Sequence, residues 1–338
     1  MRAVNLYGQM SGGPFFDDLH VGRVFDSAPS MTLTSGAAAT HQAILGDRMR
    51  LALDAELSAA VAGGRLAHPA LVCDVAIGQS TLVTQRVMAN LFYRGLTFHR
   101  FPVIGDTLAT RTEVVALKQN SVRPGRAATG LAALRMTTTD GAGRLVLDFH
   151  RCAMLPCSAD TVDTGHHDDM DAIGVADGSP ADPVADWDVA AFRARVPGSG
   201  VAPVAGTVLR STADVVSSAP ELARLTLNIA ATHHGSRVGG RRLVYGGHTI
   251  GLALAQATRL LPNLVAVSGW ESCQHTAPVH EGDTLYSDLT IEAAEPRTDG
   301  RGVTVRLRSL VYAVTDDDDG GDGADRAVLD WVFTGLVL

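Results

Sequence analysis

The chain repeats three of its own segments in the same order, and this repetition constrains its fold more than any other feature. FPVIGDTL at 101–108 recurs as APVHEGDTL at 277–285, and GGRLAHPAL at 63–71 recurs as GGRRLVYGGHTI at 239–250. VLDF at 146–149 returns as VLDW at 328–331. The first two pairs are separated by 176 and 177 residues. Because self-similarity at a fixed offset marks a repeated structural unit, the sequence predicts two copies of one fold.

The repeats predict three segments: an N-terminal copy at 1–155, a linker at 156–199 and a C-terminal copy at 200–338. The stretch at 158–188 is rich in Asp, Gly, Ala and Pro, which is typical of a linker or an exposed wrap. It contains His166 and His167 beside Asp168 and Asp169. No periodic element would hold these four side chains in place, so we interpret them as a solvated loop and expect no metal.

Each copy has the same order of elements. Apolar helices are expected at 69–83 and 247–261, each followed by three strands with alternating or buried patterns. The expected strands are 107–119, 128–140 and 144–155, and then 282–295, 302–315 and 326–338. The run Asp316 to Asp319 lacks the ligand spacing of a calcium loop and is interpreted as an acidic hairpin loop. A long helix followed by antiparallel strands is an α+β unit, with the sheet wrapped over the helix.

Composition excludes several classes of function. The net charge is −8 and there is no long run of Lys or Arg, which argues against a nucleic-acid partner. The four cysteines form no C-x-x-C pair, so neither a zinc site nor a disulfide framework is indicated. No apolar run reaches the ~18 residues that a membrane span needs. The N-terminal stretch has no secretory pattern, so we expect a cytoplasmic protein that does not bind membranes.

These features together resemble the MaoC-like dehydratases, or (R)-specific enoyl-CoA hydratases, whose hot-dog fold lays a long helix in a curled antiparallel sheet. FFDDLHVGRVF at 15–25 resembles the family's first strand entry, and PVIGDTL and PVHEGDTL resemble its recurring strand-start motif. A duplicated chain of this size resembles the double hot-dog members. LTLNIAATHH, GGRRLVYGGHTIG and VALKQNS are most similar to mesaconyl-CoA hydratases, also called β-methylmalyl-CoA dehydratases.

The resemblance implies addition of water to a trans-2-enoyl-CoA, or its removal from a 3-hydroxyacyl-CoA. The family's site motif is G-D-x-N-P-x-H, and a glycine amide at the start of the hot-dog helix binds the thioester oxygen. The C-terminal copy keeps the five-residue spacing with Asn228 and His233, but Ala231 replaces the proline. The N-terminal copy keeps Asp47, while Ala52 stands at the histidine position. Each copy therefore retains a different part of the motif.

The chemistry of hydration favours the C-terminal copy. A histidine can accept and return protons because its unperturbed pKa is ~6.5, whereas an asparagine can only orient a water or an imidazole. A backbone N–H at a helix N-terminus can meet negative charge on the thioester oxygen. At the aligned helix starts the N-terminal copy has Pro69, which has no N–H, and the C-terminal copy has Gly246. We therefore expect His233 as the acid–base, Asn228 as its orienting group and Gly246 or Gly247 as the carbonyl donor.

Further residues are predicted to bind substrate. The phosphates of CoA call for a basic rim, for which Arg241 and Arg242 are candidates, with Arg94 and Arg100 as others. His234, Tyr245 and His248 flank the expected site, and Asp47 would either reach over from the N-terminal copy or lie on the surface in a polar loop. The alternative for the whole site is structural: Asn228 caps a turn, His233 is an ordinary loop histidine and the glycines only start the helix.

The leading hypothesis is a hydratase or dehydratase acting on an enoyl-CoA or 3-hydroxyacyl-CoA, with a branched C4–C5 acyl group such as mesaconyl as one example. The alternatives are an acyl-CoA thioesterase and a non-catalytic protein that binds acyl thioesters. Expected partners are an acyl-CoA or acyl-carrier-protein thioester and, for assembly, a monomer or homodimer. No cofactor is expected, since CoA enters as part of the substrate.

Overall fold

The computed structural model describes residues 12–121, 126–159, 163–174, 182–236, 241–315 and 325–338. The acidic loop at 316–319, most of the N-terminal stretch and part of the turn at 120–125 lie outside the described residues. No helix in the described ranges is both long and apolar enough to cross a membrane.

One antiparallel sheet runs through both copies. The long strands of the N-terminal copy are β3 (Ala89–Phe98), β4 (Thr107–Gln119), β5 (Thr129–Asp140) and β6 (Leu145–Pro156). Those of the C-terminal copy are β9 (Leu264–His275), β10 (Thr284–Pro296), β11 (Val303–Ala313) and β12 (Arg326–Val337). The order is β1-β4-β5-β6-β3-β9-β12-β11-β10-β7. Pairing of β3 with β9 joins the two copies into a single sheet.

The remaining elements are short. They are the strands β1 (Val24–Phe25), β2 (Met31–Thr32), β7 (Val208–Arg210) and β8 (Asp214–Val215), the helices α1 (Ser35–Leu45), α2 (Arg50–Leu53), α3 (Ala55–Ala62), α5 (Val189–Arg195) and α6 (Ala219–Leu225), and the 3-10 turns η1 (Phe16–Asp18), η2 (Ser80–Leu82) and η3 (Ala231–His233). The two central helices are α4 (Pro69–Gln79) and α7 (Gly246–Leu260).

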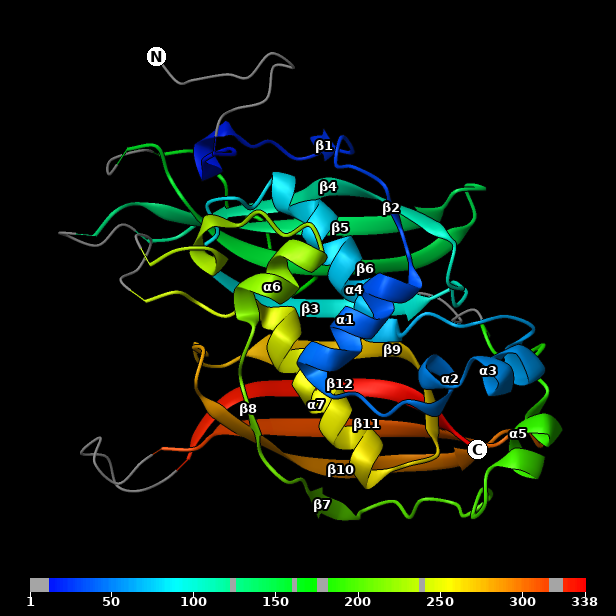
Figure 1. Ribbon diagram of the computed structural model, residues 1–338. Coiled ribbons are helices and arrows are strands. Elements are labelled where there is room, and N and C mark those ends of the chain that lie inside the picture. The colour runs from blue at the N-terminus through cyan, green and yellow to red at the C-terminus, as the bar shows by residue number, and fades with distance from the viewer. Residues whose placement is uncertain (1–11, 122–125, 160–162, 175–181, 237–240, 316–324) are drawn as a thin grey trace.

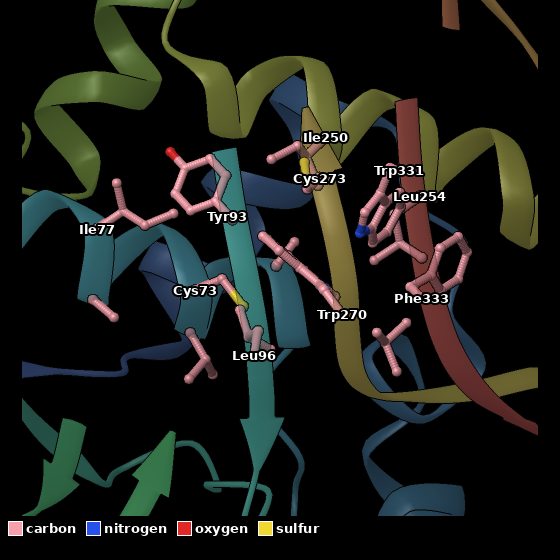
Figure 2. Close-up of a cluster of buried hydrophobic side chains, with 14 of the residues drawn as sticks. Cys73, Ile77, Tyr93, Leu96, Ile250, Leu254, Trp270, Cys273, Trp331 and Phe333 are labelled. Atoms are coloured by element: carbon pink, nitrogen blue, oxygen red, sulfur yellow. The ribbon is translucent and has the colours of Figure 1, made fainter. Parts of the chain in front are cut away.

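The helices α1, α4, α6 and α7 cover one face of the sheet (Figure 1). Every residue of α4 is buried, as a sequence that is apolar on all sides apart from Asp74 and Gln79 predicts. Side chains from the strands fill the layer under the helices, and Figure 2 shows part of it around Tyr93, Trp270, Cys273, Trp331 and Phe333. The rings of Trp331 and Phe333 stack with centroids 3.9 Å apart. The predicted α+β double hot-dog architecture is confirmed.

Equivalent contacts confirm the duplication at the level of single residues. Leu66 bridges to Val103, and 177 residues later Leu243 bridges to His280. The Gln79 amide donates to the Leu108 carbonyl at 3.0 Å, and the Gln256 amide donates to the Leu285 carbonyl at 2.9 Å. The same offset that the sequence motifs share therefore also relates the hydrogen bonds.

In each copy, the turn that follows Asp47 or Asn228 contacts the end of the central helix of the other copy. Arg48 N donates to Thr258 Oγ1 at 3.3 Å, in the last turn of α7. Ile229 N donates to Thr81 Oγ1 at 3.1 Å, in η2 directly after α4. Gly78 permits the second contact, because a Cβ there would lie 1.6 Å from the Thr226 carbonyl oxygen. The turn that carries His233 is thus positioned by the opposite copy.

Substitution of Gly78 tests this contact. We expect Gly78→Ala to lower the free energy of unfolding by about 3 kcal/mol or more, since the clash is with backbone that has no side chain to rotate away. Urea denaturation measures the change. Gly36→Ala in α1 is the matched control, because its Cβ would have only Thr34 Oγ1 at 3.8 Å. That variant should be neutral or more stable by up to about 1 kcal/mol, and equal destabilisation of both variants would contradict the close contact.

The linker differs from the exposed wrap that its composition predicts. It contains α5, whose Phe192 is fully buried, and Trp187 is 6% exposed. The Trp187 ring lies 5.5 Å from that of Phe101. Asp168 accepts a hydrogen bond from Leu117 N at 2.8 Å, so part of the linker is attached to β4. Burial of its few large apolar side chains packs part of the linker against the rest of the protein, although the surrounding residues are polar.

Candidate active site

The motif turns of the two copies have the same backbone conformation. Gly46 has φ 69° and Leu227, at the matching position, has φ 62°. Asp47 Oδ1 and Asn228 Oδ1 each accept a hydrogen bond from the amide two residues on, at 2.6 Å and 3.0 Å. A leucine in the left-handed region costs roughly 1–2 kcal/mol that a glycine avoids. The C-terminal copy has kept the turn despite this cost.

His233 is held as a neutral base. Its Nδ1 lies 2.9 Å from the Leu243 carbonyl oxygen. Since a carbonyl can only accept, Nδ1 carries the hydrogen and Nε2 is left with a free lone pair. Burial is the main cause that lowers the pKa of His233 to about 4, and the side chain is neutral at pH 7. A neutral imidazole with an unprotonated Nε2 is the form that can accept a proton from water.

Asn228 does not orient this imidazole in the way the motif predicts. Its Oδ1 is used in the turn, where it accepts from Ala230 N. Its backbone carbonyl accepts from His234 Nε2 at 2.6 Å. The group that fixes the ring of His233 is the Leu243 carbonyl. Asn228 therefore shapes the turn and holds the exposed neighbour His234.

The two central helices begin differently. Helix α4 starts at Pro69, and His68 Nδ1 accepts from Ala70 N at 3.2 Å, so its first amides are absent or capped. Helix α7 starts at Gly246 and its N-cap residue, Tyr245, makes no side-chain cap. The first amides of a helix have no partner within the helix, so those of Gly246 and Gly247 are available to an oxygen.

A buried polar cluster surrounds the start of α7, and sequence reasoning found only part of it. The rings of His233 and Tyr245 lie 5.8 Å apart, and those of Tyr93 and His275 lie 6.2 Å apart. A Cβ on Gly246 would lie 2.6 Å from His275 Nε2, which places this imidazole against the helix start. Arg151 on β6 completes the cluster, and its charge contributes to the low pKa of His233.

Tyr245 also belongs to a second polar group between the copies. Its hydroxyl donates to Asp74 Oδ1 at 3.0 Å, and His41 Nε2 lies 3.0 Å from Asp74 Oδ2. Burial and the Asp74 carboxylate raise the pKa of Tyr245, so its phenol stays protonated. Gly247 faces this carboxylate, because a Cβ there would lie 2.1 Å from Asp74 Oδ1. An acid within the apolar sequence of α4 was the signal that could have revealed Asp74.

The structure separates Asp47 from His233. Asp47 is 2% exposed, so the surface interpretation is wrong. Its Oδ1 lies 2.8 Å from His68 Nε2 and its Oδ2 lies 3.5 Å from Thr258 Oγ1. Thr258 lies twelve residues beyond Gly246 on α7, which at 1.5 Å per residue is about 18 Å. Asp47 thus holds the cap of α4 and does not reach the start of α7.

His248 lies inside the protein rather than along an open pocket. It is fully buried, and neither ring nitrogen has a hydrogen-bond partner within the described part of the chain. Burial lowers the pKa of His248 to about 4, so the ring is neutral.

The predicted arginines are engaged elsewhere or lie on the surface. Arg241 is exposed, and Arg242 forms an ion pair with Glu281. Arg94 donates to the Met170 carbonyl at 3.0 Å, so it attaches the linker to β3. Arg100 pairs with Asp106 and Asp140. The assignment of these arginines to a rim for CoA stays a prediction, and in this structure Arg94 and Arg100 each have a partner within the protein.

The matching region of the N-terminal copy is apolar. It is lined by residues that include Ala52, Pro69, Phe101 and Trp187, and its cavity is only about 10 Å³. A larger cavity of about 150 Å³ lies near the C-terminus, beside Arg193 and Leu338. Neither of these two cavities includes His233 or Gly246. In the described residues, no group of three or more His, Cys, Asp or Glu side chains is arranged to hold a metal.

Comparisons with known proteins identify the chains to which this one is similar. No protein-family model matches the chain. A β-methylmalyl-CoA dehydratase from Chloroflexus aurantiacus is 27% identical over 96% of this chain and 97% of its own length. A mesaconyl-CoA hydratase from Cereibacter sphaeroides is 25% identical over 92% of this chain and 94% of its own.

Comparison with solved structures finds further similar chains. A MaoC domain structure from Chloroflexus aurantiacus has a TM-score of 0.79 at 24% identity, with 96% of this chain and 97% of that chain covered, which bears on the fold alone. A conserved hypothetical protein from Mycobacterium tuberculosis, with a double hotdog fold, has a TM-score of 0.92. It is 67% identical over 97% of this chain and 99% of that chain. The chain therefore belongs to the same double hot-dog family as this mycobacterial protein.

Proposed function

We propose that the protein is a hydratase or dehydratase that interconverts an enoyl-CoA and a 3-hydroxyacyl-CoA. The observation that carries the proposal is the neutral, oriented imidazole of His233 beside the uncapped start of α7. The two curated relatives, named for dehydration and hydration of CoA thioesters, support the same reaction class.

The residues divide the reaction into two tasks. In hydration, His233 Nε2 accepts a proton from water while the water oxygen bonds to C3 of the enoyl group. The electron pair of the double bond moves toward C1, and negative charge gathers on the thioester oxygen. The amides of Gly246 and Gly247 would donate to this oxygen without reorganisation. The imidazolium then returns its proton to C2, and dehydration follows the same steps in reverse.

A thioesterase is less well supported by the same site. Attack of water on the thioester carbonyl usually calls for a carboxylate base, and Asn228 stands where the motif has an acid. Asp74 is already shared between Tyr245 and His41. Release of CoA from saturated acyl-CoA, followed with a thiol reagent, would separate this activity from hydration.

The direct test is a spectrophotometric assay of purified protein. Crotonyl-CoA and mesaconyl-CoA should both be examined for loss of the enoyl absorbance, since the acyl group is a separate question from the reaction. Absence of turnover with both thioesters, together with binding of either, would favour a non-catalytic thioester-binding protein.

The role of the first amide of α7 can be tested by giving α7 the proline with which α4 begins. Gly246→Pro removes an N–H at a position where a proline is tolerated, as Pro69 of α4 illustrates. We expect kcat to fall about 10²–10³-fold relative to Gly246→Ala, which retains the N–H. Both variants place a Cβ near His275, so this crowding cancels in the comparison. Equal kcat in the two variants would exclude the Gly246 amide and leave that of Gly247.

A further inference from the structure

Arg151 is a buried cation in the helix-facing interior of the N-terminal copy. It is 5% exposed, and it lies on the same face of β6 as Phe149 and Ala153, which are fully buried. Arginine is almost never this deeply buried unless it is paired. A charge on the core-facing side of a strand therefore calls for an explanation.

The described residues supply Arg151 with hydroxyl partners but no counter-charge. Its guanidinium donates to Thr84 Oγ1, and the phenol of Tyr93 lies beside it. Its Nε has no hydrogen-bond partner, and among the described residues no Asp or Glu forms an ion pair with it. Burial raises the pKa of Tyr93, so this phenol is not an anion. A guanidinium stays protonated in proteins, and an isolated buried charge is costly.

Arg151 lies at the candidate site of the C-terminal copy, although it belongs to the N-terminal one. Its charge acts on both His233 and Tyr245. Its partner Thr84 precedes Gln85, whose carbonyl accepts from Ala231 N at 2.9 Å, two residues before His233. The cation and the imidazole are therefore held against the same pair of segments.

We propose that Arg151 binds the free carboxylate of a dicarboxylyl-CoA, and so selects acyl groups that end in a second carboxyl. This inference rests on the proposed function of the site. A planar guanidinium matches a carboxylate with two parallel N–H bonds, and its unpartnered Nε is one of the donors that such a pair uses. The phosphates of CoA are strongly hydrated and stay at the surface. Only the acyl end of the substrate could reach a side chain as buried as Arg151.

Binding of two saturated thioesters tests the proposal without turnover. Succinyl-CoA and butyryl-CoA share a four-carbon chain and differ by the terminal carboxylate. Isothermal calorimetry should give a Kd for succinyl-CoA about 10–100-fold lower than for butyryl-CoA with the unaltered protein. Arg151→Gln should abolish this ratio while leaving the Kd for butyryl-CoA within about threefold, and Arg151→Lys should keep part of it.

The controls separate recognition from folding and from catalysis. Arg210→Gln, at an exposed arginine paired with Asp288, should leave the ratio unchanged. Arg151→Gln should not lower the Tm of the unliganded protein, because it removes an uncompensated charge. Equal Kd values for the two thioesters in the unaltered protein would overturn the proposal, as would equal weakening of both by Arg151→Gln.

Turnover provides an independent check on the role of this charge. If Arg151→Gln lowers kcat for crotonyl-CoA as much as for mesaconyl-CoA, the guanidinium stabilises the enolate and the carboxylate assignment fails. If neither enoyl-CoA is turned over but the succinyl-CoA preference depends on Arg151, the recognition site stands and the hydratase assignment fails.

Discussion

Replacing His233 with Gln is expected to lower kcat for hydration of an enoyl-CoA by about 10²–10⁴-fold, the usual contribution of a positioned acid–base group. Gln can still hydrogen-bond but cannot accept a proton from water near neutral pH. Because burial holds the pKa of His233 at about 4, the imidazole stays unprotonated while the protein remains folded, and kcat should show no titration of this group near pH 6.5. Stopped-time assays of enoyl absorbance between pH 5 and 8 measure both effects.

His234→Gln is the matched control for this variant. His234 is the next residue, is exposed, and within the described residues it contacts the Asn228 carbonyl, so its loss should change kcat by less than about threefold. If His234→Gln abolished turnover and His233→Gln did not, the acid–base role would belong to His234. If neither variant lowered kcat, the base would have to be sought among Tyr93, His275 and Tyr245.

Three buried histidines should make the fold sensitive to acid. The pKa values of His233, His248 and His275 are each lowered by burial from 6.5 to about 4. Between these values the unfolded chain binds more protons than the folded one, so stability is full above pH 6.5 and is lost as pH falls toward 4. Each histidine accounts for about 3 kcal/mol over this window. Their combined titration should therefore remove a large part of the free energy of unfolding across this window.

Urea denaturation at pH 7.5, 6.0 and 5.0 measures this loss. His248→Leu removes one titrating ring that has no hydrogen-bond partner in the described residues, and it should reduce the pH dependence by about a third. The exposed His20 provides the control, since His20→Asn should leave the dependence unchanged. A free energy of unfolding that is flat from pH 7.5 to 5.0 would show that the three rings are not buried as neutral groups.

Much of the fold can be predicted from the sequence, because the repeated motifs align the two copies and support helix and strand assignments that local patterns alone leave ambiguous. Six strands and both central helices lie within four residues of their predicted bounds at either end. The strands β3 and β9 were missed, and each contains an internal glycine that weakens a strand pattern. The structure explains one of them: a Cβ on Gly269 would lie 2.5 Å from the Leu96 carbonyl oxygen, where β3 and β9 join the copies. The need for a glycine at this position is visible only in the paired strands and not in the sequence of either strand.

The candidate site was predictable only in part, for a related reason. Motif spacing found His233, and the alignment of helix starts found Gly246, because both lie within one copy. Asp74 and Arg151 come from the other copy, and nothing local to them indicates what they face. Each did carry a signal that could have been used, since a charge interrupts an apolar helix in one case and the core-facing side of a strand in the other.

Hydrogen bonds at Thr81 and Thr258 join a turn of each copy to the helix end of the other copy. A change in one copy therefore affects the structure of the other. On the proposed function, the C-terminal copy contributes the imidazole of His233, and the N-terminal copy contributes Thr81, which contacts the turn before it, and Arg151. A tandem gene of this kind can let one active centre decay while the decayed half stays indispensable. On the proposed function, selection for activity of the C-terminal centre would also act on residues of the N-terminal copy.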